Sequence, residues 1–308
     1  MQAVITSLYC VLVLEIIQRV QNNAFYSNNT LNLRGELLHL DTPKVMGILN
    51  ITPDSFYEGS RVSGEKEILS QAAQMIEEGA DLLDLGGYSS RPGASAISES
   101  EECNRVLPAI RLLKDHFPKT PLSIDTFRST IARQAVDQGA SLINDISGGE
   151  QDPQMFETVA ELGVPYILMH MRGTPQTMTT LTQYDNLVKD VADYFHKKIY
   201  LLRQLGVRDL ILDPGFGFAK TAEQNFELLQ RLRYFSIFGL PLLAGLSRKA
   251  MIWKTLNTDP AGALNGTTTL NTIALANGAS ILRVHDVREA VECIALSQKI
   301  KQQPIPVS

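Results

Sequence analysis

The sequence predicts a single (β/α)8 (TIM) barrel of the α/β class with a short N-terminal extension, on three observations. A phrase of helix, glycine, short apolar strand and polar residue recurs at 77–87, 137–147, 161–170, 204–215 and 276–286. Looser copies at 119–126 and 238–249, with an opening strand at 44–50, bring the strands to eight. Nearly every strand ends in a polar or charged residue. The length of 308 residues suits one such barrel, since barrels commonly run to roughly 250 residues.

Composition narrows the function classes. The chain is 44% hydrophobic and 20% charged, with a net charge of −5 and no run of lysine or arginine. A nucleic-acid partner is therefore not expected. Three cysteines without CxxC spacing are typical of a reduced, cytoplasmic protein. No stretch approaches about 18 consecutive apolar residues, so stable membrane insertion is not expected.

The domain division follows from the pattern. Residues 31–302 form the predicted barrel and residues 303–308 a tail. Residues 1–30 form an extension that includes the apolar stretch Ala3–Ile17, which Glu15 interrupts and which lacks the features of a signal peptide. We expect this extension to be poorly ordered or loosely helical, or to reflect a start codon placed too early. A membrane-associating helix is the alternative.

Amphipathic segments alternate with the strands. In the first, the apolar residues of Glu65–Glu78 fall on one stripe, and Gly79 can turn left-handed where that helix ends. Gly139, Gly163, Gly206 and Gly278 are expected to do the same. The other predicted helices are Glu99–His116, Ser129–Asp137, Pro153–Leu162, Asp185–Leu205, Ala222–Arg233, Leu264–Ala276 and Val287–Lys301. An open doubly wound sheet is the alternative, but its GxGxxG turn after the first strand is missing.

Polar residues at the strand ends define a candidate site, because barrel active sites lie at the C-terminal rim. In strand order they are Asn50; Asp84 with Ser89, Ser90 and Arg91; Asp125; Asn144 and Asp145; His170 and Arg172; Asp213; Ser247, Arg248 and Lys249; Arg283, His285 and Asp286.

Four cations meet at this rim in a chain that is acidic overall: Arg91, Lys249, Arg283 and His285. Arginine binds phosphate through its bidentate fork and lysine binds it as a point charge. Three of the four follow strands seven and eight, where barrels often hold phosphate. The rim is therefore predicted to bind a phosphate or diphosphate. Ion pairing with acidic residues such as Asp84 or Asp286 is the alternative.

Asp125 and Asp213 each follow an apolar strand, and Asn144 lies between them in strand order. Two partly desolvated carboxylates and an amide suit a flat heterocycle with ring N–H and amino donors. Structural carboxylates that accept from loop N–H groups are the alternative. No nucleophilic triad or zinc motif is evident. Mg2+ held through Asn50 and a diphosphate is compatible with the rim. A Schiff base at Lys249 is conceivable, but the surrounding cations favour a charge-holding role.

Eight motifs then resemble one family. They are MGILNITPDSF (46–56), DLGGYSSRPGA (84–94), SIDTFRS (123–129), INDISGG (143–149), MHMRGTPQTM (169–178), DPGFGFAK (213–220), LSRKAMI (246–252) and RVHD (283–286). In this order, over Leu31 to about Leu296, they resemble the dihydropteroate synthases. The resemblance implies a transferase of folate biosynthesis, which condenses 6-hydroxymethyl-7,8-dihydropterin pyrophosphate with 4-aminobenzoate and releases pyrophosphate. It also implies Mg2+ assistance, a homodimer and a sulfonamide target.

The family's roles carry over to matched positions. Asn50 would ligate Mg2+. The diphosphate contacts would be Asn50, Ser90, Arg91, Arg283 and His285. The pterin pocket would be formed by Asp125, Asn144, Met169, Asp213 and Lys249. The aminobenzoate side would be formed by Ser90, Arg91, Pro92, Phe218 and the backbone at Ala250. Asp125, Lys249, Arg283 and His285 would be catalytic.

The resemblance also implies a dissociative substitution at the pterin methylene. Asp125 would stabilise the cation, and the Asn50 and Ser89–Arg91 loops would close over the site to exclude water. Three departures stand out: Tyr88 and Ser90 replace the usual Glu and Thr, and Ala250 replaces a common Ser. We expect them to affect loop packing and aminobenzoate affinity. The rival functions are a non-catalytic pterin-binding homologue and a pterin-dependent methyltransferase.

Overall fold

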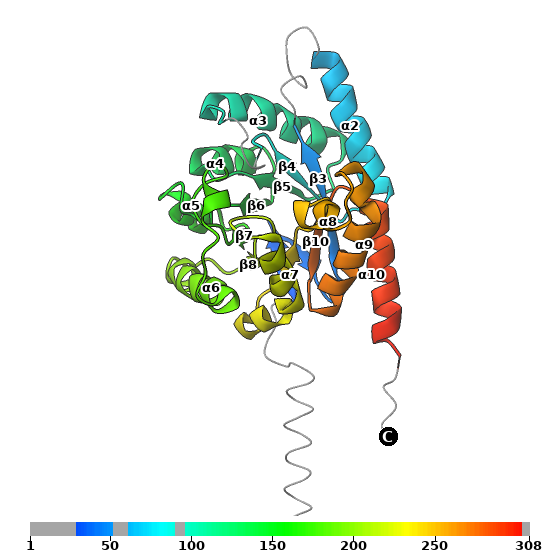
Figure 1. Ribbon diagram of the computed structural model, residues 1–308. Helices are drawn as coiled ribbons and strands as arrows, with labels where there is room; N and C mark the ends of the chain where they lie inside the picture. The colour runs from blue at the N-terminus through cyan, green and yellow to red at the C-terminus, as the bar shows by residue number, and fades with distance from the viewer. Residues whose placement is uncertain (1–28, 52–60, 90–95, 304–308) are drawn as a thin grey trace, which may run out of the picture.

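The computed structural model describes residues 29–51, 61–89 and 96–303. Its centre is a ring of eight parallel strands, with the helices outside it (Figure 1). The strands are β3 (Lys44–Asn50), β4 (Leu82–Gly86), β5 (Leu122–Asp125), β6 (Leu142–Asp145), β7 (Tyr166–Met169), β8 (Leu210–Asp213), β9 (Leu243–Ala244) and β10 (Ile281–Val284). Neighbouring strands pair in the order β8-β7-β6-β5-β4-β3-β10-β9, and a parallel bridge between Leu212 and Leu242 closes the ring. The predicted barrel is confirmed.

The helices alternate with these strands. They are α2 (Arg61–Glu77), α3 (Glu99–His116), α4 (Ser129–Asp137), α5 (Met155–Leu162), α6 (Leu187–Gln204), α7 (Ala222–Gln230), α8 (Ala250–Thr255), α9 (Leu264–Ala276) and α10 (Val287–Lys301), with 3-10 turns at Met178–Thr180, Leu232–Phe238 and Ala261–Ala263. Most bounds agree with the sequence prediction. The prediction for α7 was too long, because the chain tightens into a 3-10 helix after Gln230. The short α8 was not predicted.

Glycines end several helices as expected. Gly79, Gly139, Gly163, Gly206 and Gly278 all have positive φ, between 62° and 115°. This confirms the predicted left-handed turns between helix and strand. Side chains also fix helix starts, since the Ser98 hydroxyl accepts from the Glu101 N–H and Thr221 and Gln224 form a capping box.

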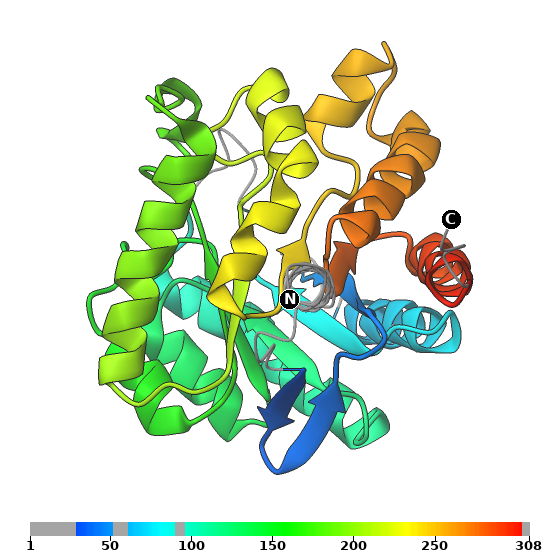
Figure 2. The same ribbon diagram turned by 90° about the horizontal axis from the view of Figure 1, so that it is seen from below.

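A β-hairpin that the sequence analysis did not predict precedes the barrel. β1 (Thr30–Leu33) pairs antiparallel with β2 (Glu36–His39) through a turn with positive φ at Arg34 and Gly35. Figure 2 shows it, in dark blue, at the N-terminal end of the barrel. Its buried side chains join an apolar layer inside the ring, whose members are Leu31, Leu33, Leu40, Met46, Leu82, Leu142, Ile167, Ile211, Leu243 and Ile281. The hairpin therefore fills the N-terminal end of the barrel, opposite the C-terminal ends of the strands.

Alternation along each strand separates two faces. Outward residues such as Leu83, Ile124 and Leu212 pack on the helices in the main core. Inward residues supply the apolar layer at the N-terminal end and polar groups toward the C-terminal end. The division into an extension, a barrel and a tail stays a prediction, because residues 1–28 and 304–308 lie outside the described residues.

Candidate active site

The alternation of inward and outward residues explains where six of the predicted site residues lie. Asp125, Asn144, Met169, Asp213 and Arg283 share the inward register, one step beyond the apolar layer in most strands, and Asn50 ends β3. Asp84 shares this register, lying opposite Ile48 on one side and Ser123 on the other. Asp145 points outward, where its carboxylate accepts from the Tyr166 hydroxyl at 2.7 Å. The structure therefore separates Asp145 from the rim residues with which the sequence grouped it.

Arg283 lies at the centre of a polar cluster. Its Nε donates to Asp84 Oδ2 and its Nη2 donates to Asp125 Oδ2, each at 2.6 Å. The Asn144 amide Nδ2 also donates to Asp84 Oδ2, at 2.9 Å. Asp84 is fully buried, and the Asp125 and Arg283 side chains are 13% and 20% exposed. Charged hydrogen bonds of this kind hold both carboxylates and the guanidinium in fixed directions.

Burial and charge shift the ionisation of this cluster. Burial raises the pKa of Asp125 to about 7; Arg283 opposes the rise, and the negative charges of Asp84, Glu102 and Asp145 add to it. For Arg283, burial lowers the pKa, but Asp84 and Asp125 more than offset this, so its pKa lies above the usual range. The guanidinium therefore stays charged while Asp125 titrates near neutral pH.

Lys249 and Asp213 form a second pair of charges beside the cluster. Burial lowers the pKa of Lys249 to about 8, an effect that Asp213 partly offsets. The Lys249 ammonium lies 4.2 Å from the centre of the Phe218 ring. Burial raises the pKa of Asp213, although the Gly215 N–H donates to its carboxylate at 2.8 Å. A cation and an acid with shifted pKa values therefore face one pocket.

These side chains line a single pocket inside the C-terminal rim. Its lining residues are Asn144, Ile146, Met169, Asp213, Phe216, Phe218, Gly245, Lys249 and Arg283. The apolar wall continues into a buried cluster of Ile146, Met169 and Phe218, against which Phe127 packs. A pocket with apolar walls and convergent donors, acceptors and charges suits a flat, polar-edged heterocycle.

The other rim cations are engaged differently. Arg248 pairs with Asp286 through two hydrogen bonds, of 3.0 and 2.6 Å. Nδ1 of His285 lies 2.9 Å from the Ser247 hydroxyl, which also accepts from the His285 N–H. Ion pairing, the alternative to anion binding, therefore applies to Arg248 and, within the barrel, to Arg283.

Of the remaining residues predicted to contact substrates, the structure describes some and not others. Asn50 is exposed at the end of β3, and Ala250 is exposed as the first residue of α8. Ser90, Arg91 and Pro92 lie outside the described residues, as do parts of both loops that were expected to close over the site. The Tyr88 hydroxyl accepts from the Gln176 amide at 2.9 Å, and its ring packs edge-on against Phe127. Tyr88 therefore joins the loop after β4 to the loop after β7.

Magnesium would have few protein ligands here. In the described ranges, no group of three or more His, Cys, Asp or Glu residues is arranged to hold a metal ion. Asn50 offers one amide oxygen at the rim. This donor set fits an ion that keeps water and takes most of its oxygens from a bound diphosphate, as Mg2+ commonly does.

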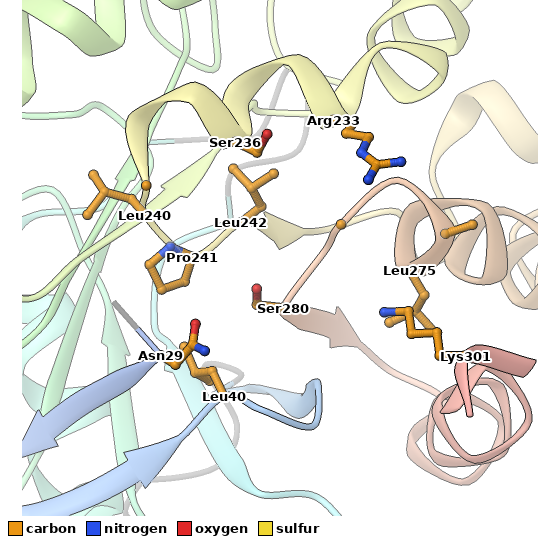
Figure 3. Close-up of a pocket in the computed structure, with 13 residues that line it drawn as sticks. Asn29, Leu40, Arg233, Ser236, Leu240, Pro241, Leu242, Leu275, Ser280 and Lys301 are labelled. Carbon is orange, nitrogen blue, oxygen red and sulfur yellow. The ribbon is translucent and has the colours of Figure 1, made fainter. Parts of the chain in front are cut away.

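A larger hollow, of about 410 Å³ and open to solvent, lies at the opposite end of the barrel (Figure 3). Its wall includes the exposed Arg233 and Lys301, together with Leu40, Leu242 and Ser280. Its lining residues include no carboxylate, and its cations are exposed. We place the candidate site at the C-terminal rim, where buried charges of both signs converge.

Two residues have structural roles at the site that the sequence did not assign to them. Asp84 was expected at the rim, and as an ion-pair partner, but its position between Asn144 and Arg283 was not predicted. Lys220 is buried beneath the pocket, where its ammonium lies 3.0 Å from His170 Nδ1 and donates to the carbonyls of Gly215 and Phe218. Burial lowers the pKa of Lys220 to about 7. A lysine directly after the glycine-rich segment DPGFGFA was the available signal for this loop-fixing role.

Comparisons with known proteins agree with this geometry. A sequence profile described as "Pterin binding enzyme" matches residues 46–285. Dihydropteroate synthase of Synechocystis sp. is 46% identical over 79% of this chain and 85% of its own length. The Escherichia coli enzyme is 43% identical over 85% and 93%. A structure of Xanthomonas albilineans dihydropteroate synthase with 4-aminobenzoic acid superposes with a TM-score of 0.83 and 38% identity, covering 90% of this chain and 99% of that one.

Proposed function

Because this chain belongs to the dihydropteroate synthase family of pterin-binding enzymes, we propose that it condenses 6-hydroxymethyl-7,8-dihydropterin pyrophosphate with 4-aminobenzoate. The products are 7,8-dihydropteroate and pyrophosphate. The observation that carries this proposal is the buried cluster in which Asp84 and Asp125 hold Arg283 and Asn144, two residues that line the pocket together with Asp213 and Lys249.

The pocket chemistry matches the pterin. Asp213 and the Asn144 carbonyl oxygen can accept from ring N–H and amino groups, and Lys249 can donate to a ring acceptor. Met169 and Phe218 supply apolar surface for the faces of the ring. Arg283 and His285 lie on the same strand end, where they would hold the diphosphate. The aminobenzoate side would include Phe218, Ala250 and the undescribed Ser90, Arg91 and Pro92.

The reaction requires stabilised charge rather than a nucleophilic side chain. When the bond between the methylene carbon and the diphosphate oxygen breaks, the electrons leave with the diphosphate and the pterin becomes a cation. Asp125 supplies a negative charge for that cation, and Arg283 supplies a positive charge for the leaving group. The amine of 4-aminobenzoate then bonds to the methylene carbon and releases a proton. One well-aimed group of this kind contributes about 3 kcal/mol.

Mg2+ belongs to the proposal as well. Asn50 would hold it through its amide oxygen, with the diphosphate and water completing the shell. When bound, the ion supplies positive charge that neutralises the diphosphate.

A homodimer is the proposed assembly. Ile273 on α9 and Leu296 and Ile300 on α10 are 39%, 68% and 73% exposed, and the two helices pack side by side (Figure 1). Exposed apolar side chains on adjacent helices suit a subunit interface. Analytical ultracentrifugation of the parent and of Leu296→Glu tests this: the parent should sediment as a dimer and the variant should dissociate.

A cytoplasmic location is proposed from cysteine usage, since Cys103 and Cys293 are free thiols. Across the ranges that the structure describes, no helix has the length and apolarity to span a bilayer.

The direct test is incubation with the pterin pyrophosphate, 4-aminobenzoate and Mg2+. We expect dihydropteroate by mass spectrometry and an equal amount of pyrophosphate. Asp125→Ala is the matched control for contaminating activity. Pterin binding without either product would favour the binding-only homologue, and methyl transfer without pyrophosphate release would favour the methyltransferase. The relatives named above favour neither rival.

A further inference from the structure

Asp84 lies under the pocket rather than in its wall. Its carboxylate is fully buried on the inward face of β4. One of its oxygens, Oδ2, accepts both from Asn144 of β6 and from Arg283 of β10. The other, Oδ1, is buried and has no hydrogen-bond partner among the described residues. The charge of Asp84 is therefore directed through Oδ2 toward two residues that line the pocket.

This bond decides what Asn144 presents to a ligand. A side-chain amide has a donating end and an accepting end. Because Nδ2 is directed to Asp84, the carbonyl oxygen Oδ1 is the end that remains for the pocket. Asn144 is thereby fixed as an acceptor, which suits the ring N–H and amino groups of a pterin.

The same oxygen holds Arg283. A guanidinium has five N–H bonds in one plane. Nε is directed to Asp84 and one Nη2 hydrogen to Asp125. These two anchors fix the plane, so the remaining N–H groups point in a set direction. The two carboxylates also compensate the charge of a largely buried arginine before any anion binds.

We infer that Asp84 is a positioning residue for the proposed condensation: without touching the substrate, it presents the Asn144 carbonyl oxygen and the open edge of Arg283 to the pterin pyrophosphate. The inference rests on the proposed function for its substrate. The underlying geometry consists of three hydrogen bonds that join four strands, β4, β5, β6 and β10, inside the barrel.

A change in the charge of Asp84 also has a signature in the pH profile. The charged groups around Asp125 are Arg283 on β10, Asp84 on β4, Glu102 on α3, Asp145 on β6 and Lys249, which precedes α8. Replacing Asp84 with the neutral, isosteric Asn removes one like charge and leaves the guanidinium to Asp125 alone. Both effects stabilise the ionised form of Asp125 relative to its protonated form, so the pKa of Asp125 should fall.

The test compares Asp84→Asn with Ser123→Ala. Ser123 lies opposite Asp84 in the strand register, is buried, and its hydroxyl has no partner among the described residues. For Asp84→Asn we expect kcat/KM for the pterin pyrophosphate to fall at least about tenfold. We expect the KM for 4-aminobenzoate to change less than about threefold, and the acidic limb of the pH profile to move to lower pH. Ser123→Ala should change none of the three.

An Asp84→Asn protein with the parental acidic limb and pterin kinetics would overturn the inference. So would equal losses for both substrates with an unmoved limb, which indicate general structural damage. If Asp84→Asn does not fold by circular dichroism, Asn144→Ala tests the same bond from its other end. That variant should bind the pterin pyrophosphate at least about tenfold more weakly by calorimetry, and unchanged affinity would refute the role of Asp84.

Calorimetry also separates the two proposals. If the parent binds the pterin pyrophosphate but forms no dihydropteroate, the proposed function fails. The effect of Asp84→Asn on binding then still decides whether Asp84 positions the pocket.

Discussion

Arg283 Nη2 lies 2.6 Å from Asp125 Oδ2, although the two residues are 158 positions apart in the chain. The contact places the proposed holder of the leaving group beside the proposed stabiliser of the cation. One ligand can therefore touch both charges, and substitutions of the two residues should have different effects.

Asp125→Ala should reduce turnover by roughly a hundredfold, the scale of one preorganised charge, while pyrophosphate affinity falls much less. Arg283 remains in the variant, and it no longer shares its charge with a second carboxylate. Steady-state kinetics and pyrophosphate inhibition constants measure the two effects. Equal losses in both would contradict the role given to Asp125.

The pH dependence should follow the Asp125 carboxylate. Burial raises its pKa to about 7, so activity that requires the carboxylate should fall as pH drops through that value. The free energy of unfolding should instead decrease as pH rises. Because the pKa of Asp125 is higher in the folded chain than in the unfolded chain, Asp125 stabilises the fold fully below its unfolded pKa near 4, and this contribution is lost as pH rises through about 7. Asp125→Asn should remove this pH dependence of Tm, and a parental slope in that variant would assign the titration to another group.

Arg283→Met should cost stability as well as pyrophosphate affinity. It leaves Asp84 and Asp125 inside the barrel without their cation, and breaking a buried pair costs about 3 kcal/mol or more. Arg288→Met is the control, because Arg288 is 69% exposed and lies 3.8 Å from Glu78. Exposed pairs contribute less than about 1 kcal/mol. Urea unfolding measures both variants, and similar losses would mean that the inner cluster is better solvated than its burial indicates.

Lys249→Met should separate stability from activity. Burial holds the Lys249 pKa at about 8, below the ordinary value of 10.5. Between those two values the unfolded chain binds more protons than the folded one, so folding becomes more favourable as pH rises. At neutral pH the charged lysine therefore opposes folding. We expect the variant to keep or raise its Tm at pH 7 and to lose at least about tenfold in kcat/KM for the pterin substrate. A lower Tm would show that Lys249 has a stabilising partner.

Two truncations test the hairpin. Removing residues 1–28 leaves β1 and β2 whole, and we expect activity and Tm to be retained. Removing residues 1–40 also deletes Leu31, Leu33 and Leu40 from the inner apolar layer. Each buried leucine contributes about 1.5–3 kcal/mol, so Tm should fall by roughly 10 °C or more. Inactivity of a folded 29–308 protein would show that the extension has a function.

The barrel and most of its inward polar residues could be predicted from the sequence, because each strand carries its own signal. The glycine before the strand, the apolar run and the polar residue at its end are all local signals. Asp125, Asn144, Asp213 and Arg283 were found in this way.

Ion pairing of the rim cations with Asp84 or Asp286 was left open as an alternative, but which cation pairs with which carboxylate could not be predicted, because that depends on the register of strands that are distant in the chain. Arg283 and Asp84 are 199 positions apart, and nothing near either residue indicates the other. The hairpin was missed for a different reason. Its turn uses Arg34 and Gly35 instead of the Asn-Gly or Asp-Gly pair that signals a tight hairpin. Asp145 was grouped with the rim because polarity alone does not tell which face of a strand a residue occupies.

The hairpin closes the N-terminal end of the barrel with apolar side chains, and this affects the order in which ligands can bind. Leu31 is wholly buried there, so among the described residues the apolar layer separates the pocket from that end, and we expect ligands to enter from the C-terminal rim. The ligand bound deeper in the pocket must bind before the ligand nearer the rim, and it must dissociate after that ligand. We therefore expect the pterin pyrophosphate to bind before 4-aminobenzoate. A bulky ligand at the aminobenzoate side should then slow the dissociation of the bound pterin.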